Sequence, residues 1–283
     1  MIQRTFLLHA LSALHVGTGQ SVGTVDLPIA RAKASNLPLV PGSAIKGVLR
    51  DEIHTPDIKD HKILFGPEST KADVETHAGA IAVGDANLLI LPIRSFAGTV
   101  AFATCPFILK HYARDMALKE TIPVPAADTA NIGTTSELKI GSKIALEDLD
   151  ISANNNADTQ KWASKIATAL YPTDSTWQAE FTKRFVILPD NIFSFLADTA
   201  TEVRMRISID RNTRIVKEGA LWSEENLPAE SVLWGVIGVS NSRDKTNPKN
   251  AEELSKLLPT GETHLQIGGK HTVGRGLCRM VLA

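Results

Sequence analysis

Residues 267–276 read Ile-Gly-Gly-Lys-His-Thr-Val-Gly-Arg-Gly and separate two short apolar segments, residues 263–267 and 277–282. Glycine is needed where a backbone takes a positive φ or where another backbone approaches closely. Lys270 and Arg275 add cationic donors beside this bare main chain. The pattern predicts two strands joined by a phosphate-binding loop. The alternative is a long glycine-rich hairpin that binds nothing.

The composition is ordinary for a soluble globular protein and argues mildly against a free-standing nucleic-acid binder. Hydrophobic residues make up 43% and charged residues 22% of the 283 positions, and the net charge is −1. Proteins that bind nucleic acid alone usually carry a basic face, so such a function here must use locally grouped cations or many copies along one strand. The glycine-rich loop of residues 267–276 also lacks the spacing of a Walker A loop or of a dinucleotide-binding turn.

Cysteine usage and hydropathy predict a cytoplasmic protein that does not enter a membrane. Cys105 and Cys278 have apolar or aromatic neighbours and are predicted to be reduced core thiols. Residues 6–16 superficially resemble a signal peptide, but two histidines interrupt them and no convincing cleavage site follows, so we interpret them as a first strand. No apolar stretch reaches the roughly 20 residues that a membrane span requires.

The rest of the chain alternates strand-like and helix-like segments, which predicts an α+β fold in one domain over residues 1–283. Residues 54–80 are polar and rich in histidine and are predicted to be a mobile loop insertion, whereas residues 120–157 are predicted to be a polar connection. Further strands are expected at residues 79–93, 98–107, 185–188, 203–209 and 232–239, and helices at residues 43–53, 108–119, 158–170 and 251–258.

The predicted helix over residues 43–53 carries two cations on one face. Ser43 is expected to be its N-cap, because a serine hydroxyl accepts a hydrogen bond from one of the first free amides. Lys46 and Arg50 are four residues apart, and such like charges cost roughly 0.2–0.5 kcal/mol. An anion lying across this face would more than offset that cost, and the free amides of the helix start would add to the attraction. The alternative is a solvated basic face.

Residues 204–225 predict a projecting hairpin with a basic face. Arg204 and Arg206 alternate with apolar residues, which places both cations on one side of a strand. A turn containing Arg211 follows, and the chain then returns. The alternative is an ordinary edge hairpin that is blunted with charges.

Five motifs occur in an order that resembles the RAMP superfamily of CRISPR effector proteins. Within that superfamily the chain is most similar to the backbone subunit of the type III-B (Cmr) complex. The motifs are His15-x-Gly-x-Gly with Val25-Asp-Leu-Pro28, Pro41-Gly-Ser-x-Ile-Lys-Gly-x-Leu-Arg50, Gly84-Asp-Ala-x-Leu-Leu-x-x-Pro-Ile-Arg-Ser95 with Thr104-Cys-Pro106, Ile209-Asp-Arg-x-Thr213 leading into Gly219-Ala-Leu-Trp-Ser-Glu-Glu-x-Leu-Pro228, and the closing loop. Together they span residues 15–276.

This resemblance implies a ferredoxin-like, RRM-like palm with inserted fingers and a protruding thumb hairpin. The insertions would lie at about residues 54–80 (a loop), 107–200 (a helical finger segment) and 204–231 (the thumb). It also implies that many copies bind one guide RNA (crRNA) head to tail, together with other Cmr subunits. Each copy would cleave the complementary target RNA at a regular interval, with Mg²⁺ or another divalent cation.

The same resemblance implies the site residues. Asp26 matches the essential carboxylate and would hold the metal, His15 matches a histidine at the start of the same loop, and either Glu225 or Glu224 matches a third catalytic position. A carboxylate suits Mg²⁺, which keeps several waters and takes one or two protein carboxylates. Histidine suits proton transfer to or from a 2′-hydroxyl. The residues expected to bind RNA are Ser43, Lys46, Arg50, Arg204, Arg206, Arg211, Gly268, Gly269, Lys270, Gly274, Arg275 and Gly276.

Two other functions stay open on the sequence. The chain could be a non-catalytic, architectural crRNA-binding subunit, or a stand-alone RAMP endonuclease that processes the guide RNA. His54, His61 and His77 are predicted to be solvated loop residues, because their spacings fit no metal-ligand template. Asp85, His111 and Asp115 are expected to be structural.

Overall fold

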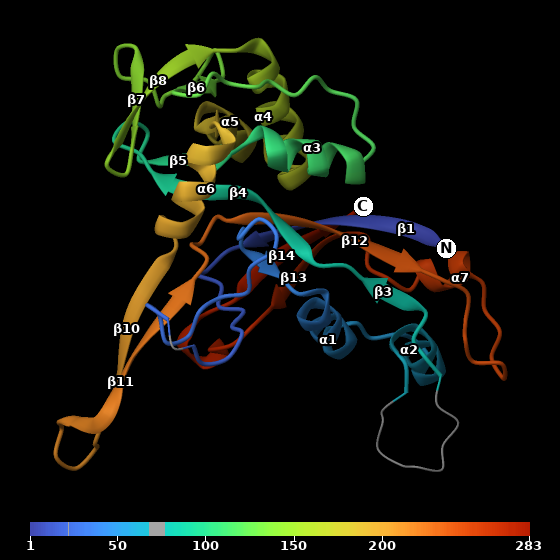
Figure 1. Cartoon of the computed structure of the whole chain (residues 1–283). Coiled ribbons are helices and arrows are strands. Elements are labelled where there is room, and N and C mark those ends of the chain that lie inside the picture. The colour runs from blue at the N-terminus through green and yellow to red at the C-terminus, as the bar shows by residue number, and fades with distance from the viewer. Residues whose placement is uncertain (22, 68–76) are drawn as a thin grey trace.

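The computed structural model describes residues 1–21, 23–67 and 77–283, which form a mixed α/β protein around one large mixed sheet (Figure 1). The strands are β1 (Ile2–Ala10), β2 (Leu39–Val40), β3 (Ile81–Val83), β4 (Ala86–Arg94), β5 (Val100–Thr104), β6 (Thr129–Ile132), β7 (Lys143–Leu146), β8 (Leu149–Asn155), β9 (Phe185–Ile187), β10 (Glu202–Ile209), β11 (Val216–Asn226), β12 (Val232–Val239), β13 (Gly261–Gln266) and β14 (Leu277–Leu282). The helices are α1 (Gly42–Glu52), α2 (Ile58–Phe65), α3 (Pro106–Asp115), α4 (Ala157–Leu170), α5 (Ser175–Lys183), α6 (Asp190–Thr199), α7 (Ala251–Ser255) and the 3-10 turn η1 (His271–Val273).

The first and last strands of the chain are neighbours in the sheet. β1 pairs antiparallel with β12 on one side and with β14 on the other. In this register Ala10 lies opposite Cys278, and His9 lies opposite Val232. The loop after β1, the loop before β14 and the connection from β11 to β12 therefore meet at one end of the central strands. The full strand order is β13-β14-β1-β12-β4-β5-β9-β6-β8-β7, with β2 on β4 and β3 on β12.

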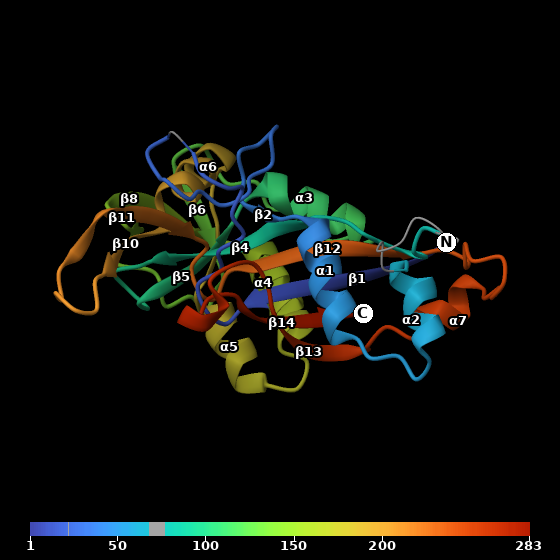
Figure 2. The ribbon, with the colours of Figure 1, turned by 90° about the horizontal axis from the view of Figure 1, so that it is seen from below.

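Helices cover both faces of the central strands. Figure 1 shows α1 and α2 on one side and α3 and α4 on the other, and the view from below shows α1 lying across β1, β12 and β14 (Figure 2). A strand covered on both faces does not need polar residues at every second position. Residues 88–93 of β4 and 232–235 of β12 are accordingly buried without interruption. The largest side chains in this core include Phe6, Leu49 and Trp162.

Strands β6 to β8 show that the prediction of a polar connection over residues 120–157 was wrong. β6 pairs in parallel with β8, so that Asn131 lies opposite Asn154. Asn156 then begins α4, because its side chain accepts a hydrogen bond from the Thr159 N–H at 2.9 Å. The asparagine run thus ends a strand and caps a helix. The prediction overlooked a short alternation before this run, in which Leu149, Ile151 and Ala153 are separated by Asp150 and Ser152.

The predicted loop insertion over residues 54–80 is partly helical. α2 begins after Asp57, whose side chain accepts a hydrogen bond from the Lys59 N–H at 2.8 Å. His61 in this helix is bonded through Nε2 to the carbonyl of Arg50 at 2.7 Å. The remainder of the prediction, over residues 68–76, falls outside the described residues.

The start of α1 is stabilised by a residue from elsewhere in the chain. The helix begins after Pro41, which has no side-chain cap, and the N–H of Gly42 donates to Asp85 Oδ1 at 2.8 Å. Ser43 is exposed inside the first turn, so the prediction that it is the N-cap was wrong. The carboxylate of Asp85 reaches the first amide from the β3–β4 turn, which confirms the structural role expected for this acid.

Residues 202–226 form the predicted hairpin, a separate two-stranded sheet of β10 and β11 that projects from the rest of the molecule (Figure 1). Asp210 forms its turn by accepting hydrogen bonds from the N–H groups of Asn212 at 2.9 Å and Thr213 at 3.0 Å. These two amide bonds, that of Thr213 foremost, lower the pKa of Asp210.

Both cysteines are free and buried, as predicted. Burial raises the pKa of Cys278 to about 12 and also raises the pKa of Cys105. Neither thiol is therefore ionised at neutral pH. Within the described ranges, none of the helices combines the length and apolar character that crossing a bilayer demands.

Candidate functional site

Two loops and the base of the hairpin come together at one end of the central strands. We call residues 11–38 the first loop and residues 267–276 the closing loop. The closing loop is bonded to the first loop through Gly269 N–H to the carbonyl of His15 at 2.9 Å and Gly276 N–H to the carbonyl of Ala13 at 3.0 Å. The first loop is in turn bridged to β11 at Leu27. Every predicted catalytic residue lies in or beside this junction.

Glycine is required in the closing loop by its close packing. Gly268 has a φ of +88°, and a Cβ there would lie 2.3 Å from the carbonyl oxygen of His15. Gly276 has a φ of +76°, and a Cβ there would lie 2.0 Å from the carbonyl oxygen of Ile267. Between them Lys270 takes a left-handed conformation at φ +65° and leads into η1. The N–H groups of residues 271 and 272 donate to none of the described residues, so this part of the loop does present bare amides.

Asp26 is an exposed side chain that is held by one residue of the hairpin. Its Oδ2 accepts hydrogen bonds from both the N–H and the hydroxyl of Ser223, each at 2.8 Å. The backbone N–H of Asp26 donates back to Ser223 Oγ at 3.0 Å. The Ser223 bonds, led by that from the backbone, lower the pKa of Asp26, so its carboxylate is charged at neutral pH.

His15 is buried, and its environment fixes one tautomer. Nδ1 lies 2.7 Å from the carbonyl oxygen of Glu225. A carbonyl oxygen can only accept, so Nδ1 carries the hydrogen and Nε2 of the neutral ring carries the lone pair. Nε2 faces Gly17, where an added Cβ would lie 2.8 Å away. The missing side chain of Gly17 therefore leaves room beside the atom that could accept a proton.

Glu224 and Lys270 form an ion pair between the hairpin and the closing loop. The two charged atoms, Lys270 Nζ and Glu224 Oε1, lie 2.9 Å apart, and Trp222 Nε1 donates to the same oxygen at 2.7 Å. Lys270 also lies over the Trp222 ring, and Arg206 Nε is 4.0 Å from Oε1. Burial raises the pKa of Glu224, but the bonds from Trp222 and Lys270 outweigh it and the pKa is lowered. Oε2 is buried without a partner among the described residues.

Glu225 fastens the first loop to the hairpin. Its Oε1 accepts hydrogen bonds from Arg31 at 2.6 Å and from Thr201 at 3.0 Å, and its Oε2 accepts the N–H of Ile29 at 3.1 Å. Both carboxylate oxygens are thus engaged by protein donors, and the residue is buried. Of the two neighbouring glutamates, Glu225 has the role of a structural anchor.

The two faces of the hairpin differ in their chemistry. Cross-strand pairing places Arg206 opposite Trp222 and Arg204 opposite Glu224 on one face. The other face has Ser223 and Glu225 at its base. Beyond them it carries large apolar residues that are about half exposed or more, namely Val203, Met205, Ile207 and Leu221. Because adjacent residues of a strand point to opposite faces, Asp26 is held on the apolar face and Lys270 on the cationic face.

The remaining predicted RNA-binding cations differ in how far they are already engaged. Arg50 donates to the carbonyl of Gly66 at 3.1 Å and Arg204 is paired with Glu202, whereas Lys46 and Arg211 bond to none of the described residues. Arg275 is 8% exposed, yet its Nε has no partner in the described part of the chain. A buried guanidinium without a counter-charge is costly and is suited to an anion that comes from outside.

The residues around Asp26 fit a hydrated divalent cation. Across residues 1–21, 23–67 and 77–283 no three His, Cys, Asp or Glu side chains gather closely enough to cage a metal. Asp26 Oδ1 accepts no hydrogen bond from those residues, and the side chain is exposed. Mg²⁺ typically binds through one or two carboxylates with water and substrate phosphate completing its shell, and Asp26 can supply such a carboxylate.

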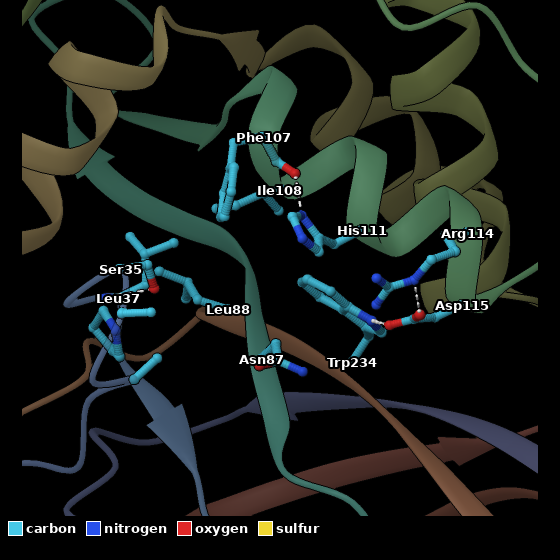
Figure 3. Close-up of a pocket in the computed structure, with 13 residues that line it drawn as sticks. Ser35, Leu37, Asn87, Leu88, Phe107, Ile108, His111, Arg114, Asp115 and Trp234 are labelled. Carbon is cyan, nitrogen blue, oxygen red and sulfur yellow. Dashed lines mark hydrogen bonds and ion pairs between the residues drawn. The ribbon is translucent and has the colours of Figure 1, made fainter.

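A pocket of about 230 Å³ between α3 and β4 is formed by residues whose polar atoms serve the fold (Figure 3). His111 Nδ1 is bonded to the carbonyl of Phe107 at 2.8 Å, and Asp115 accepts hydrogen bonds from Arg114 at 2.8 Å and Trp234 Nε1 at 3.1 Å. These contacts confirm that His111 and Asp115 are structural. The predicted site residues are not among those that line this pocket.

Sequence reasoning missed the residues that hold the predicted ones in place. Ser223 lies in the motif of residues 219–228, but its hydrogen-bond partner Asp26 is 197 positions away. Arg31 is the counter-ion of Glu225 across 194 positions. The sequence signal for Ser223 is that it precedes Glu224 in a strand. This places the two side chains on opposite faces of the hairpin but does not identify the residue that each one contacts.

The comparisons with known proteins agree with this architecture. The RAMP superfamily matches residues 7–279. The chain is 33% identical to the CRISPR system Cmr endoribonuclease Cmr4 of Pyrococcus furiosus, over 97% of this chain and 94% of that protein. A crystal structure of oligomeric Cmr4 from Pyrococcus furiosus superposes with a TM-score of 0.74 at 26% identity, over 100% of this chain and 98% of that chain.

A cryo-EM structure of the type III-B Cmr-beta complex bound to cognate target RNA contains a chain with the same fold, at a TM-score of 0.74 and 19% identity over 100% of this chain and 97% of that chain. The superfamily match covers the first loop, α1, the hairpin and the closing loop, which are the elements that build the site. This chain belongs to the RAMP superfamily.

Proposed function

We propose that the protein is a backbone subunit of a type III-B CRISPR effector complex that binds guide RNA in repeated copies and cleaves complementary target RNA at regular intervals. The single observation that carries the proposal is the exposed Asp26, fixed by Ser223 beside a loop that presents bare amides and an Arg275 whose Nε has no partner among the described residues. The relative that is 33% identical is named an endoribonuclease of the Cmr system. We expect the complex to act in the cytoplasm.

The strand order supports a ferredoxin-like palm. β14-β1-β12-β4, with α1 and α7 as the connecting helices, follows the order of a split βαβ unit. The β10–β11 hairpin would be the thumb, and the segment from α3 to α6 would supply the fingers. A related Cmr4 has been crystallised as an oligomer, which supports assembly of further copies along one guide. Other Cmr subunits would complete the complex.

The closing loop and α1 would hold the guide backbone. Arg275 and Lys46 offer positive charge, and the free amides of the closing loop offer donors to phosphate oxygens. Such contacts position RNA without reading its sequence, because base pairing with the guide supplies the specificity. This division fits a chain whose net charge is −1, since each copy grips only a short piece of RNA.

Cleavage would use attack by the 2′-hydroxyl next to the scissile phosphate. A divalent cation, when bound, stabilises the charge that develops on the phosphoryl oxygens. Asp26 would hold that cation or orient the attacking hydroxyl through Oδ1. His15 would accept or hold a proton at Nε2, because its Nδ1 is committed to the Glu225 carbonyl. Glu225 would act through the anchoring of the first loop.

The test is target cleavage by complexes assembled with the Asp26→Asn variant. Replacing the charge is expected to lower the single-turnover cleavage rate by at least about a hundredfold, while binding of target RNA is unchanged. A matched control is Asp158→Asn on α4, which should leave the rate unaltered because Asp158 pairs with Lys161 outside the junction of the two loops and the hairpin. Undiminished cleavage by Asp26→Asn would instead identify an architectural crRNA-binding subunit.

A further inference from the structure

We propose that Ser223 is the positioning residue that sets the orientation of the Asp26 carboxylate. Ser223 is buried at the base of the hairpin, 6% exposed, whereas Asp26 is exposed on the first loop. Three hydrogen bonds join the two residues, two of them to the same oxygen, Oδ2. The role rests on the proposed function, because it concerns what Asp26 does there.

The arrangement leaves one carboxylate oxygen for the substrate side. Oδ2 is engaged by the N–H and the hydroxyl of Ser223 at 2.8 Å each, while Oδ1 accepts nothing from the described residues. A carboxylate held through one oxygen cannot rotate freely about its terminal bond. Its second oxygen therefore keeps a fixed direction before RNA or a metal ion arrives, and such preorganisation is what a productive geometry requires.

The backbone on either side of this contact is fixed as well. Leu27, the residue after Asp26, donates to the carbonyl of Ser223 at 3.1 Å and accepts the N–H of Glu225 at 3.0 Å. Residues 26 and 27 of the first loop are thus tied to residues 223 and 225 of β11. The Ser223 hydroxyl couples Asp26 to the hairpin, which an apolar side chain such as alanine or valine at this buried position could not do.

A hydroxyl is what this position must supply if the side chain is to hold Asp26. Ser223 lies opposite Met205 on the apolar face of the hairpin, where neighbours such as Val203 and Leu221 are hydrophobic. A hydroxyl in such a row adds little to the stability of a β-hairpin, where β-branched and aromatic residues pack better. Its bonds go to Asp26 in both directions, as donor and as acceptor.

The experiment measures cleavage and binding of target RNA separately, in complexes assembled with Ser223→Ala, Ser223→Cys, Ser223→Thr and Asp26→Asn. Ser223→Ala keeps the backbone donor and removes the hydroxyl, so the protein should still assemble. We expect its single-turnover cleavage rate to fall roughly tenfold to a hundredfold, with target binding within about twofold of the parent protein. Ser208→Ala, on the paired strand β10, is the matched control and should cleave at the parent rate.

The conservative variants keep the proposal testable if alanine impairs assembly. Ser223→Thr retains a hydroxyl and is expected to recover most of the rate, while Ser223→Cys fills the same space with a weak donor and is expected to be slow. Parent-like cleavage by Ser223→Ala or Ser223→Cys, with Asp26→Asn inactive, would overturn the positioning role and leave the proposed function standing. A Ser223→Thr variant as slow as alanine would overturn it too. Normal cleavage by Asp26→Asn would remove the proposed function itself.

Discussion

Asp26 and Lys270 are bound to consecutive residues of β11 and lie on its opposite faces. Asp26 accepts two hydrogen bonds from Ser223, and Lys270 forms an ion pair with Glu224 at 2.9 Å. The candidate cleaving acid and the candidate guide-binding loop are therefore both attached to β11, one on each of its faces. The proposed cleavage at regular intervals requires a constant distance between the cleaving acid and the loop that binds the guide, and attachment of both to one strand would maintain that distance.

We expect the Lys270→Met variant to lose stability because it leaves Glu224 charged and buried. Glu224 is fully buried, while the Lys270 side chain is 32% exposed, so the cost should lie below that of a fully buried pair, at about 2 kcal/mol. Urea unfolding of the variant measures it. The Glu224→Gln/Lys270→Met double variant is expected to regain part of the loss. Additive losses in the two single variants would show that the pair is not coupled.

The same pair predicts a pH dependence of stability. The pKa of Glu224 is lowered from its ordinary value near 4.5 in the folded protein. A carboxyl group with a lowered folded pKa stabilises the protein above its unfolded pKa, and this contribution is lost as the pH falls through the folded value. The free energy of unfolding of the parent protein should therefore approach that of Glu224→Gln below about pH 4.5. A constant difference between the two proteins across the acid range would contradict this assignment.

Two glycines of the closing loop offer a matched comparison of steric and conformational cost. Gly274 and Gly276 both have a φ of +76°, but a Cβ on Gly274 would meet nothing within 4 Å, whereas one on Gly276 would lie 2.0 Å from the carbonyl oxygen of Ile267. Gly274→Ala should cost about 1–2 kcal/mol for the left-handed conformation alone. Gly276→Ala should cost clearly more, and thermal unfolding of both variants tests the order. Equal costs would mean that the loop moves aside at Gly276.

Replacement of Arg275 should separate stability from RNA binding. Its Nε is buried without a partner in the described part of the chain, so Arg275→Met is expected to leave the free energy of unfolding unchanged or slightly raised. Guide-RNA affinity should fall, and the slope of log K against log salt should become smaller by about one. Fluorescence anisotropy over a salt series measures both. Lys161→Met is the control, because Lys161 already pairs with Asp158 on α4. An unaltered slope for Arg275→Met would place the RNA elsewhere.

The parts of the fold with strong apolar runs could be predicted from the sequence. The strands on either side of the closing loop, the α1 helix and the β10–β11 hairpin were found because apolar period and turn residues coincide there. β6 to β8 were missed because the asparagine run and its polar surroundings outweighed the short apolar alternation of residues 149–153. The cap of α1 was misassigned to Ser43 because the helix begins earlier, after Pro41, and its first amide, Gly42 N–H, is bonded by Asp85, 43 positions away.

The site could be predicted only as a set of residue types. Resemblance brought out Asp26, His15 and the two glutamates, and the structure gathers all of them at one junction. It could not tell Glu224 from Glu225, because the distinction depends on which face of β11 each side chain takes and on partners such as Arg31 and Lys270. Those partners come from loops at both ends of the chain, and no local spacing links them.

The pairing of β1 with β12 and β14 also sets when the site can form during synthesis. β1 is made well before its partners β12 and β14, and the closing loop lies between β13 and β14. Contacts between such distant segments form late, because a large stretch of chain must be ordered to bring them together. A polypeptide that lacks β14 therefore has no finished closing loop, and the proposed RNA site forms only after the strands of residues 261–282 have been made.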